Sequence, residues 1–138
     1  MADIKTIEAR SRNMAAIKGK NTKPEEVVRK YLFHHGFRYR KNVSGLPGTP
    51  DIVLPKYKTI IFVNGCFWHK HEGCKYFVWP QNNAEFWREK IMKNVERDQR
   101  DYRLLKDMGW RVLIVWECQL KKRCIDSTLD GLIDLIIS

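Results

Sequence analysis

The sequence predicts an α/β fold in which a mixed β-sheet is flanked by helices and a structural zinc site is present. Three observations predict it. Amphipathic helical segments and short β-branched runs follow one another in the order α-β-β-β-α-β-α. The chain has 138 residues, which suffices for one domain with a single core. Cysteine and histidine, the ligands that Zn²⁺ prefers, gather in one window, residues 65–74.

The N-terminal segment, residues 1–23, is polar and basic, and we expect an arm there, followed by a folded domain over residues 24–138. Basic arms commonly track the phosphates of nucleic acids. A tail without a function is the alternative that the composition leaves open. The arm residues that we assign to DNA binding are Arg10, Arg12, Lys18 and Lys20.

The first helix is expected to begin near Thr22 and to end at Gly36. Thr22 and Glu25 have the spacing of a capping box, and Pro24 suits a first helical turn. The following residues place apolar side chains at helical spacing. This helix therefore has clear signals at both of its ends.

Three strands are expected next. Residues 37–43 alternate apolar or aromatic with basic residues, as a half-exposed strand does, and residues 44–50 are rich in turn formers. Residues 51–54 follow a proline, which favours an extended start. Residues 59–63 are continuously β-branched or aromatic, which is typical of a buried central strand.

The C-terminal half predicts two helices around a strand. Residues 84–108 form a long basic amphipathic helix that is capped by Gly109, with Asp98 placed on its apolar face. Residues 110–116 form another apolar strand. Residues 126–137 carry leucine and isoleucine on one side, as a final helix packed on the sheet would.

The charge indicates a polyanionic partner. Lysine and arginine total 26 against 16 acidic residues, which gives a formal net charge of +10. Nucleic acid is the partner that this excess favours, and solubility alone is the alternative. No signal peptide and no membrane-spanning run is visible, so we expect a cytoplasmic protein with reduced thiols and no membrane association.

The cysteines and histidines predict one closed zinc site. Cys66, His71 and Cys74 are close enough in sequence to bind one ion, and Cys118 would complete the tetrahedron from the end of the last strand. Four nitrogen and sulfur ligands without an open position make a structural site. Scattered free thiols are the alternative, and Cys124 is expected to be a free thiol in a loop.

Three polar residues are candidates for chemistry, although each has an ordinary explanation. Asp51 at a strand start could bind Mg²⁺, but aspartate is also common in turns. Glu25 could serve only the capping box. His69 is left over beside the zinc ligands and could act as a general base. The adjacent Phe67 and Trp68 in the same loop are typical of rings that stack on bases.

Several blocks in order resemble the very-short-patch repair (Vsr) family of DNA mismatch endonucleases, and the resemblance covers nearly the whole length. The blocks are Arg-Ser-Arg-Asn-Met (10–14), Thr-Lys-Pro-Glu (22–25), Gly-Thr-Pro-Asp (48–51), Gly-Cys-Phe-Trp-His (65–69), Lys-Asn-Val-Glu-Arg-Asp (93–98) and Gly-Trp-Arg-Val-Leu-Ile-Val-Trp-Glu-Cys (109–118).

The resemblance implies a restriction-endonuclease-like fold and strand-specific nicking beside a thymine mispaired with guanine, the product of 5-methylcytosine deamination. It implies that Asp51 is the essential Mg²⁺ ligand and that Glu25 holds metal-bound waters. His69 would activate the attacking water, and the backbone carbonyl of Val63 would complete the metal shell. This reaction would initiate very-short-patch repair.

The resemblance also implies how double-stranded DNA with a T:G mismatch is held. Phe67, Trp68 and Trp87 match the aromatics that wedge into the base stack, although the helical spacing of Trp87 alone would place it in a core. Asp98 either orients a loop histidine or belongs to a buried ion pair. We expect a monomer, with mismatch-repair proteins as candidate partners.

This chain departs from the family pattern at two places. Val63-Asn64 stands where family members have Thr-His, and Asn64 cannot titrate near neutral pH. One extra residue precedes Cys74, and Gly73 could absorb it in a turn. Two other functions stay open from sequence alone: a restriction-like nuclease of other specificity, and a zinc-stapled DNA-binding module without catalysis.

Overall fold

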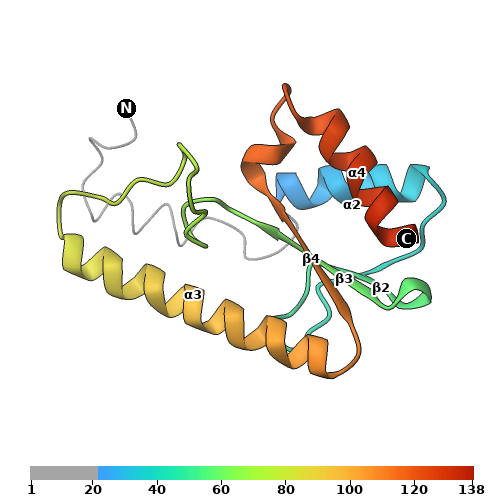
Figure 1. Cartoon of the computed structure of the whole chain (residues 1–138), viewed down its shortest axis with the longest axis horizontal. Helices are drawn as coiled ribbons and strands as arrows, with labels where there is room; N and C mark the ends of the chain where they lie inside the picture. The colour runs from blue at the N-terminus through green and yellow to red at the C-terminus, as the bar shows by residue number, and fades with distance from the viewer. Residues whose placement is uncertain (1–21) are drawn as a thin grey trace.

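A four-stranded mixed sheet with helices on both faces forms the body of the protein (Figure 1). The computed structural model describes residues 22–138, so the expected arm with Arg10, Arg12, Lys18 and Lys20 lies outside the described residues. The elements are α2 (Lys23–His34), β1 (Arg40–Lys41), β2 (Ile52–Leu54), the 3₁₀ turn η2 (Pro55–Tyr57), β3 (Thr59–Asn64), α3 (Ala84–Asp107), β4 (Arg111–Trp116), the 3₁₀ turn η3 (Glu117–Leu120) and α4 (Ile125–Ile137).

The sheet has the strand order β1-β2-β3-β4. Strand β2 pairs antiparallel with β1 and with β3, whereas β3 and β4 are parallel, in register from Thr59 opposite Arg111 to Asn64 opposite Trp116. Helix α3 makes the crossover between these two parallel strands, as parallel neighbours require. The predicted α/β class and the predicted order of elements are confirmed.

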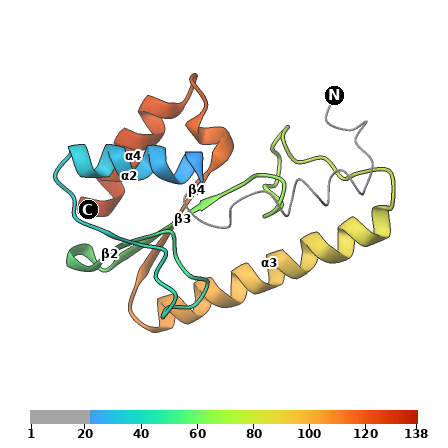
Figure 2. The ribbon, with the colours of Figure 1, turned by 180° about the vertical axis from the view of Figure 1, so that it is seen from behind.

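The two faces of the sheet carry two separate cores. Helices α2 and α4 cover one face, and α3 crosses the other (Figures 1 and 2). The first core joins Leu32 of α2 and Leu132 of α4 to strand residues such as Ile61. The second joins Tyr102 and Leu105 of α3 to the opposite side chains of β2 and β3. Because β3 is buried on both sides, it has the continuous apolar sequence of a central strand.

The start of α2 has the cap that the sequence predicts. The Thr22 hydroxyl oxygen accepts a hydrogen bond from the Glu25 backbone N–H at 3.4 Å, and Pro24 lies in the first turn. The carboxylate of Glu25 pairs with Arg29 one turn later, with a nitrogen–oxygen distance of 3.1 Å. Glu25 is buried, which a purely capping residue at a helix start need not be.

The strand predicted over residues 37–43 is wrong in its extent. Only Arg40–Lys41 pairs with β2, because Asn42 has a φ of 50°, a left-handed conformation that ends an extended strand. Phe37 packs in the first core instead of alternating along a strand. The alternating pattern here reflects a short edge strand preceded by one aromatic ring, Phe37, that is packed in the core.

No helix within residues 22–138 is long and apolar enough to cross a membrane.

Candidate active site and metal cluster

A cleft of about 1170 Å³ opens where β3 ends, between the start of α2 and the middle of α3. Its walls come from the start of α2, the turn before β2, the end of β3 with the loop that follows it, one side of α3, and the first residue of η3. The three predicted catalytic residues, two of the three predicted wedge aromatics and Asp98 line it together: Glu25, Asp51, His69, Phe67, Trp68 and Asp98.

The antiparallel pairing of β2 with β3 brings Asp51 to Val63. One carboxylate oxygen of Asp51, Oδ2, accepts a hydrogen bond from the Val63 backbone N–H at 2.7 Å. Pro50, which is buried, holds the chain extended into β2 just before this carboxylate. The two residues expected to bind Mg²⁺ therefore lie against each other at the floor of the cleft.

The environment of Asp51 disfavours a lone negative charge. Burial raises the pKa of the Asp51 carboxyl to about 7; the Val63 N–H opposes this rise, and the nearby Glu25 carboxylate adds to it. Two carboxylates held close together repel each other unless a proton or a cation lies between them. Hard oxygen donors in this arrangement fit a divalent cation such as Mg²⁺, which binds through one or two carboxylates.

His69 is oriented by Asp98. Its ring nitrogen Nδ1 lies 2.5 Å from a carboxylate oxygen of Asp98 on α3. A histidine that donates from Nδ1 keeps its other nitrogen, Nε2, available as a base. Both side chains are partly shielded, with exposed fractions of 24% and 14%. This arrangement makes His69 able to take a proton from a group in the cleft.

Asn64 lies one residue beyond Val63 and is 3% exposed. Its side-chain amide donates a hydrogen bond to the hydroxyl of Tyr102 at 2.9 Å. Burial raises the pKa of Tyr102 to about 12, so this hydroxyl stays protonated. The pair therefore contributes a fixed neutral contact between β3 and α3.

The predicted wedge rings are packed on one another. Phe67 and Trp68 meet edge to face with ring centroids 5.0 Å apart, and their centroids lie 5.8 and 6.1 Å from that of Trp87 on α3. Phe67 and Trp68 are half-buried, whereas Trp87 is 1% exposed. Trp87 therefore lies behind the two loop rings as a support, in the core position that its helical spacing predicts.

Asn94 is a site residue that sequence reasoning missed. Its side-chain amide donates a hydrogen bond to the backbone carbonyl of Trp68 at 3.2 Å, which ties the loop to α3. Its spacing contained a signal. Asn94 is seven residues after Trp87 and four before Asp98, so the three lie on one face of the helix. A polar residue on that face needed a partner, and the loop backbone is that partner.

Four predicted metal ligands converge behind this loop. The ligand atoms of Cys66, His71, Cys74 and Cys118 all lie within 4.8 Å of one another. The parallel pairing of β3 and β4 explains the convergence: Asn64 is opposite Trp116, so the residues two further along, Cys66 and Cys118, emerge together.

Local contacts orient the ligands. The His71 ring stacks on Trp116 at 4.1 Å between centroids and turns its Nδ1 to within 3.4 Å of the Cys118 sulfur. Burial raises the pKa of the Cys66 thiol to about 12, so a bound cation is needed to hold it as thiolate. Cys124 lies outside the cluster and is exposed, and all four cysteines are free thiols.

A basic chain that places a carboxylate pair and an oriented histidine in one cleft, beside a Cys/His cluster, has the groups that a metal-dependent nuclease needs. The sequence profile of the family described as DNA mismatch endonuclease Vsr matches residues 2–75. The chain belongs to this family, and it is a DNA mismatch endonuclease.

Curated relatives agree with this membership. The type II nicking enzyme V.NmeAIP of Neisseria meningitidis is 51% identical over 125 residues, covering 91% of this chain and 89% of the relative. The DNA mismatch endonuclease Vsr of Escherichia coli is 48% identical, over 89% of this chain and 78% of the relative. The type II nicking enzyme V.XorIIP of Xanthomonas oryzae is 41% identical, over 97% and 98%.

Proposed function

We propose that this endonuclease nicks one strand of duplex DNA beside a T:G mismatch that arises from 5-methylcytosine deamination. The reaction is a Mg²⁺-dependent phosphodiester hydrolysis that initiates very-short-patch repair. One observation carries the proposal: the cleft brings the Asp51–Glu25 carboxylates and the His69–Asp98 pair next to two aromatic rings on one loop. Hydrolytic groups and a stacking wedge thus share one surface.

Asp51 and the backbone carbonyl of Val63 would hold Mg²⁺, with Glu25 close by. When bound, the ion supplies charge neutralisation at the scissile phosphate. His69 takes the proton of the attacking water at Nε2. Asp98 holds Nδ1 and stabilises the imidazolium that this transfer creates. Arg29, one helical turn later, pairs with the Glu25 carboxylate and limits its movement.

The mismatch is selected by the cost of opening the stack. Phe67 and Trp68 enter between base pairs while Trp87 supports them from behind. Unstacking a step costs a few kcal/mol, and the cost is lowest at a pair that is already weakened. The same rings therefore favour T:G over a matched pair. Basic residues of the arm, Arg10, Arg12, Lys18 and Lys20, add phosphate contacts from the other groove.

The Cys66, His71, Cys74 and Cys118 cluster binds a structural Zn²⁺ in this proposal. Thiolate and imidazole are soft ligands that suit Zn²⁺, and four of them leave no open position. The ion would fasten the loop that carries both the rings and His69. The protein would act as a monomer in the bacterial cytoplasm, with mismatch-repair proteins as partners.

A nuclease of other specificity is the second candidate, because several relatives are named as type II nicking enzymes. Strand cleavage of duplexes that carry each possible mismatch in varied sequence contexts separates the two. The first proposal predicts Mg²⁺-dependent nicking of T:G duplexes far above all others. Equal nicking of matched duplexes would favour the second candidate.

A further inference from the structure

Two lysines from distant parts of the chain share one tyrosine ring. The Nζ atoms of Lys75 and Lys121 each lie 5.2 Å from the centre of the Tyr76 ring, which is 46% exposed. Lys75 follows the metal cluster directly, and Lys121 follows η3. The contact is a double cation–π arrangement, in which the ring attracts both ammonium groups electrostatically. We call Lys75, Tyr76 and Lys121 the two-lysine patch.

The Cys/His cluster brings the two lysines together. Lys75 is adjacent to Cys74, and Lys121 is three residues after Cys118, so the convergence of the two sulfur atoms also joins these segments. The Tyr76 backbone N–H donates a hydrogen bond to the Cys74 sulfur at 3.4 Å. The position of the patch is therefore set by the same contacts that build the cluster.

The patch concentrates positive charge without an acidic partner. Within residues 22–138, neither lysine forms an ion pair with a carboxylate. Because both Nζ atoms lie 5.2 Å from one ring centre, they are within about a Debye length of each other, ~10 Å at 0.1 M salt. Exposed Lys122 and Arg123 follow in sequence and add to the charge. Such a surface is suited to a polyanion.

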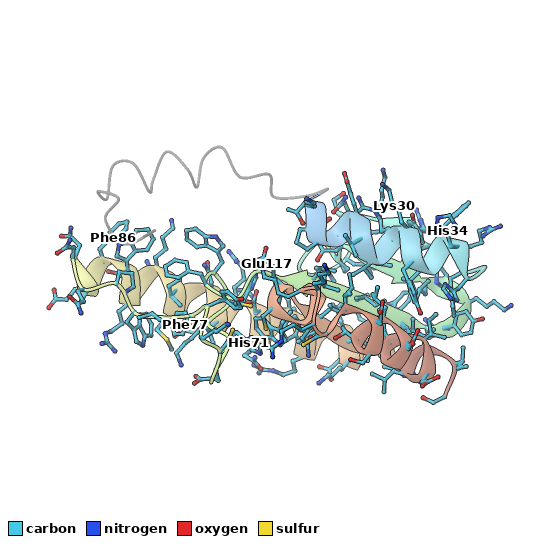
Figure 3. All side chains as sticks on the ribbon, turned by 90° about the horizontal axis from the view of Figure 1, so that it is seen from above. Lys30, His34, His71, Phe77, Phe86 and Glu117 are labelled. Carbon is cyan, nitrogen blue, oxygen red and sulfur yellow. The ribbon has the colours of Figure 1, made fainter. Side chains whose placement is uncertain are left out.

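The patch is connected to the wedge through Phe77. Phe77, the residue after Tyr76, packs against Phe67 with ring centroids 6.1 Å apart. Figure 3 shows Phe77 and His71 toward the end of the molecule that carries Phe86, away from His34. The segment that carries Lys75 and Tyr76 thus continues directly into a ring that contacts Phe67.

We propose that Lys75 and Lys121 bind backbone phosphates of the DNA duplex close to the wedge. This inference rests on the proposed function, because it takes duplex DNA with inserted rings as the ligand. The site is separate from the cleft, since neither lysine lines it. Phosphate contacts carry no sequence information, so the patch adds affinity and register to matched and mismatched duplexes alike.

The test is the salt dependence of DNA binding by the double variant Lys75→Gln/Lys121→Gln. Log affinity falls with log salt, and each lost phosphate contact makes this dependence less steep by about 0.9. The slope of the double variant should therefore be smaller in magnitude than that of wild type by about 1.8. The ratio of the wild-type affinity to that of the double variant should then fall about tenfold between 50 and 200 mM salt. The loss should be equal for T:G and matched duplexes.

Two control variants keep the test specific. Lys56→Gln/Lys58→Gln removes two lysines that also lie over aromatic rings, at the β2–β3 turn on the far end of β3 (Figure 1). It should keep the wild-type slope. Lys75→Arg/Lys121→Arg keeps both charges and should also keep the slope. Zinc content and circular dichroism establish that each variant is folded.

An unchanged slope in the glutamine variant, or an equal loss in the arginine variant, would overturn the phosphate assignment. Nicking of the T:G duplex by the wild-type protein is measured separately. If nicking fails while the slope changes, the proposed function is wrong and the patch stands. If nicking succeeds while the slope is unchanged, the patch alone is wrong.

Discussion

At the residue scale, Asp51, the proposed Mg²⁺ ligand, lies where its negative charge lowers the stability of the fold. The pKa of Asp51 is raised from 3.8 to about 7, so folding disfavours its ionised form. The unfolded chain ionises this group from about pH 4, whereas the folded protein does so only near pH 7. Protonated Asp51 therefore contributes to the free energy of unfolding. This contribution is fully present below about pH 4 and is lost as the pH rises to about 7.

Asp51→Asn should consequently stabilise the protein at pH 8 in buffer without Mg²⁺. The expected gain is about 1–4 kcal/mol, shrinking toward pH 4, because the amide cannot ionise and can still accept from Val63. Urea unfolding at both pH values measures it, with Glu96→Gln, an exposed carboxylate on α3, as the matched control. An Asp51→Asn protein less stable than wild type at pH 8 would contradict this account.

At the element scale, the turn before β2 positions Asp51 through a tight contact with α3. Gly48 has a φ of +77°, and a Cβ there would lie 3.2 Å from Asp101 Cβ and Oδ2 and from a Phe62 ring carbon. Gly45 lies in the same turn, with nothing within 4 Å of its Cβ position. The sequence predicts a turn at both glycines, and the structure distinguishes them by the left-handed φ of Gly48 and by its contact with α3.

Gly48→Ala should therefore destabilise the fold by about 1–3 kcal/mol and slow nicking, because the added methyl displaces the chain that leads to Asp51. Gly45→Ala should change both quantities little. Denaturant unfolding and single-turnover nicking measure the pair. Equal behaviour of the two variants would show that the contact with α3 does not position the turn.

The wedge loop is the second element whose role depends on placement. Trp68→Ala should weaken binding to a T:G duplex by about 1–3 kcal/mol, the value of one stacked ring, and weaken matched binding less. Phe33→Ala removes an exposed ring of α2 and should affect neither. Gel-shift titrations of both duplexes measure the difference. An equal loss on the two duplexes would make Trp68 an ordinary packing residue.

Helices and buried strands were predictable because their periodicity and end signals agree, as at Thr22 and Pro24. The convergence of Cys66 with Cys118 was expected from ligand chemistry, but its cause, the parallel register of β3 with β4, involves residues about fifty apart. The contact of Asn94 with the Trp68 carbonyl was not predictable, because sequence shows a helix face but not the backbone that docks on it.

At the scale of the whole molecule, the Cys/His cluster links β3, β4 and the loop that carries the wedge and His69. Purified protein should contain about one zinc per chain, and Cys118→Ser should lower both zinc content and stability, because structural zinc contributes directly to folding. Cys124→Ser removes an exposed thiol outside the cluster and should change neither. Elemental analysis measures the zinc content of each variant, and thermal unfolding measures its stability. A fully folded protein without metal would refute the structural role of zinc.

The most direct test of the account is single-turnover nicking of a T:G duplex and its matched counterpart by wild type and Asp51→Asn, with affinity measured on the same preparations. Wild type should nick the T:G duplex in Mg²⁺ and leave the matched duplex largely intact. Asp51→Asn should abolish nicking yet bind DNA nearly as well, because affinity comes mainly from basic side chains on phosphates. Near-wild-type nicking by Asp51→Asn, or equal nicking of both duplexes by wild type, would contradict the account.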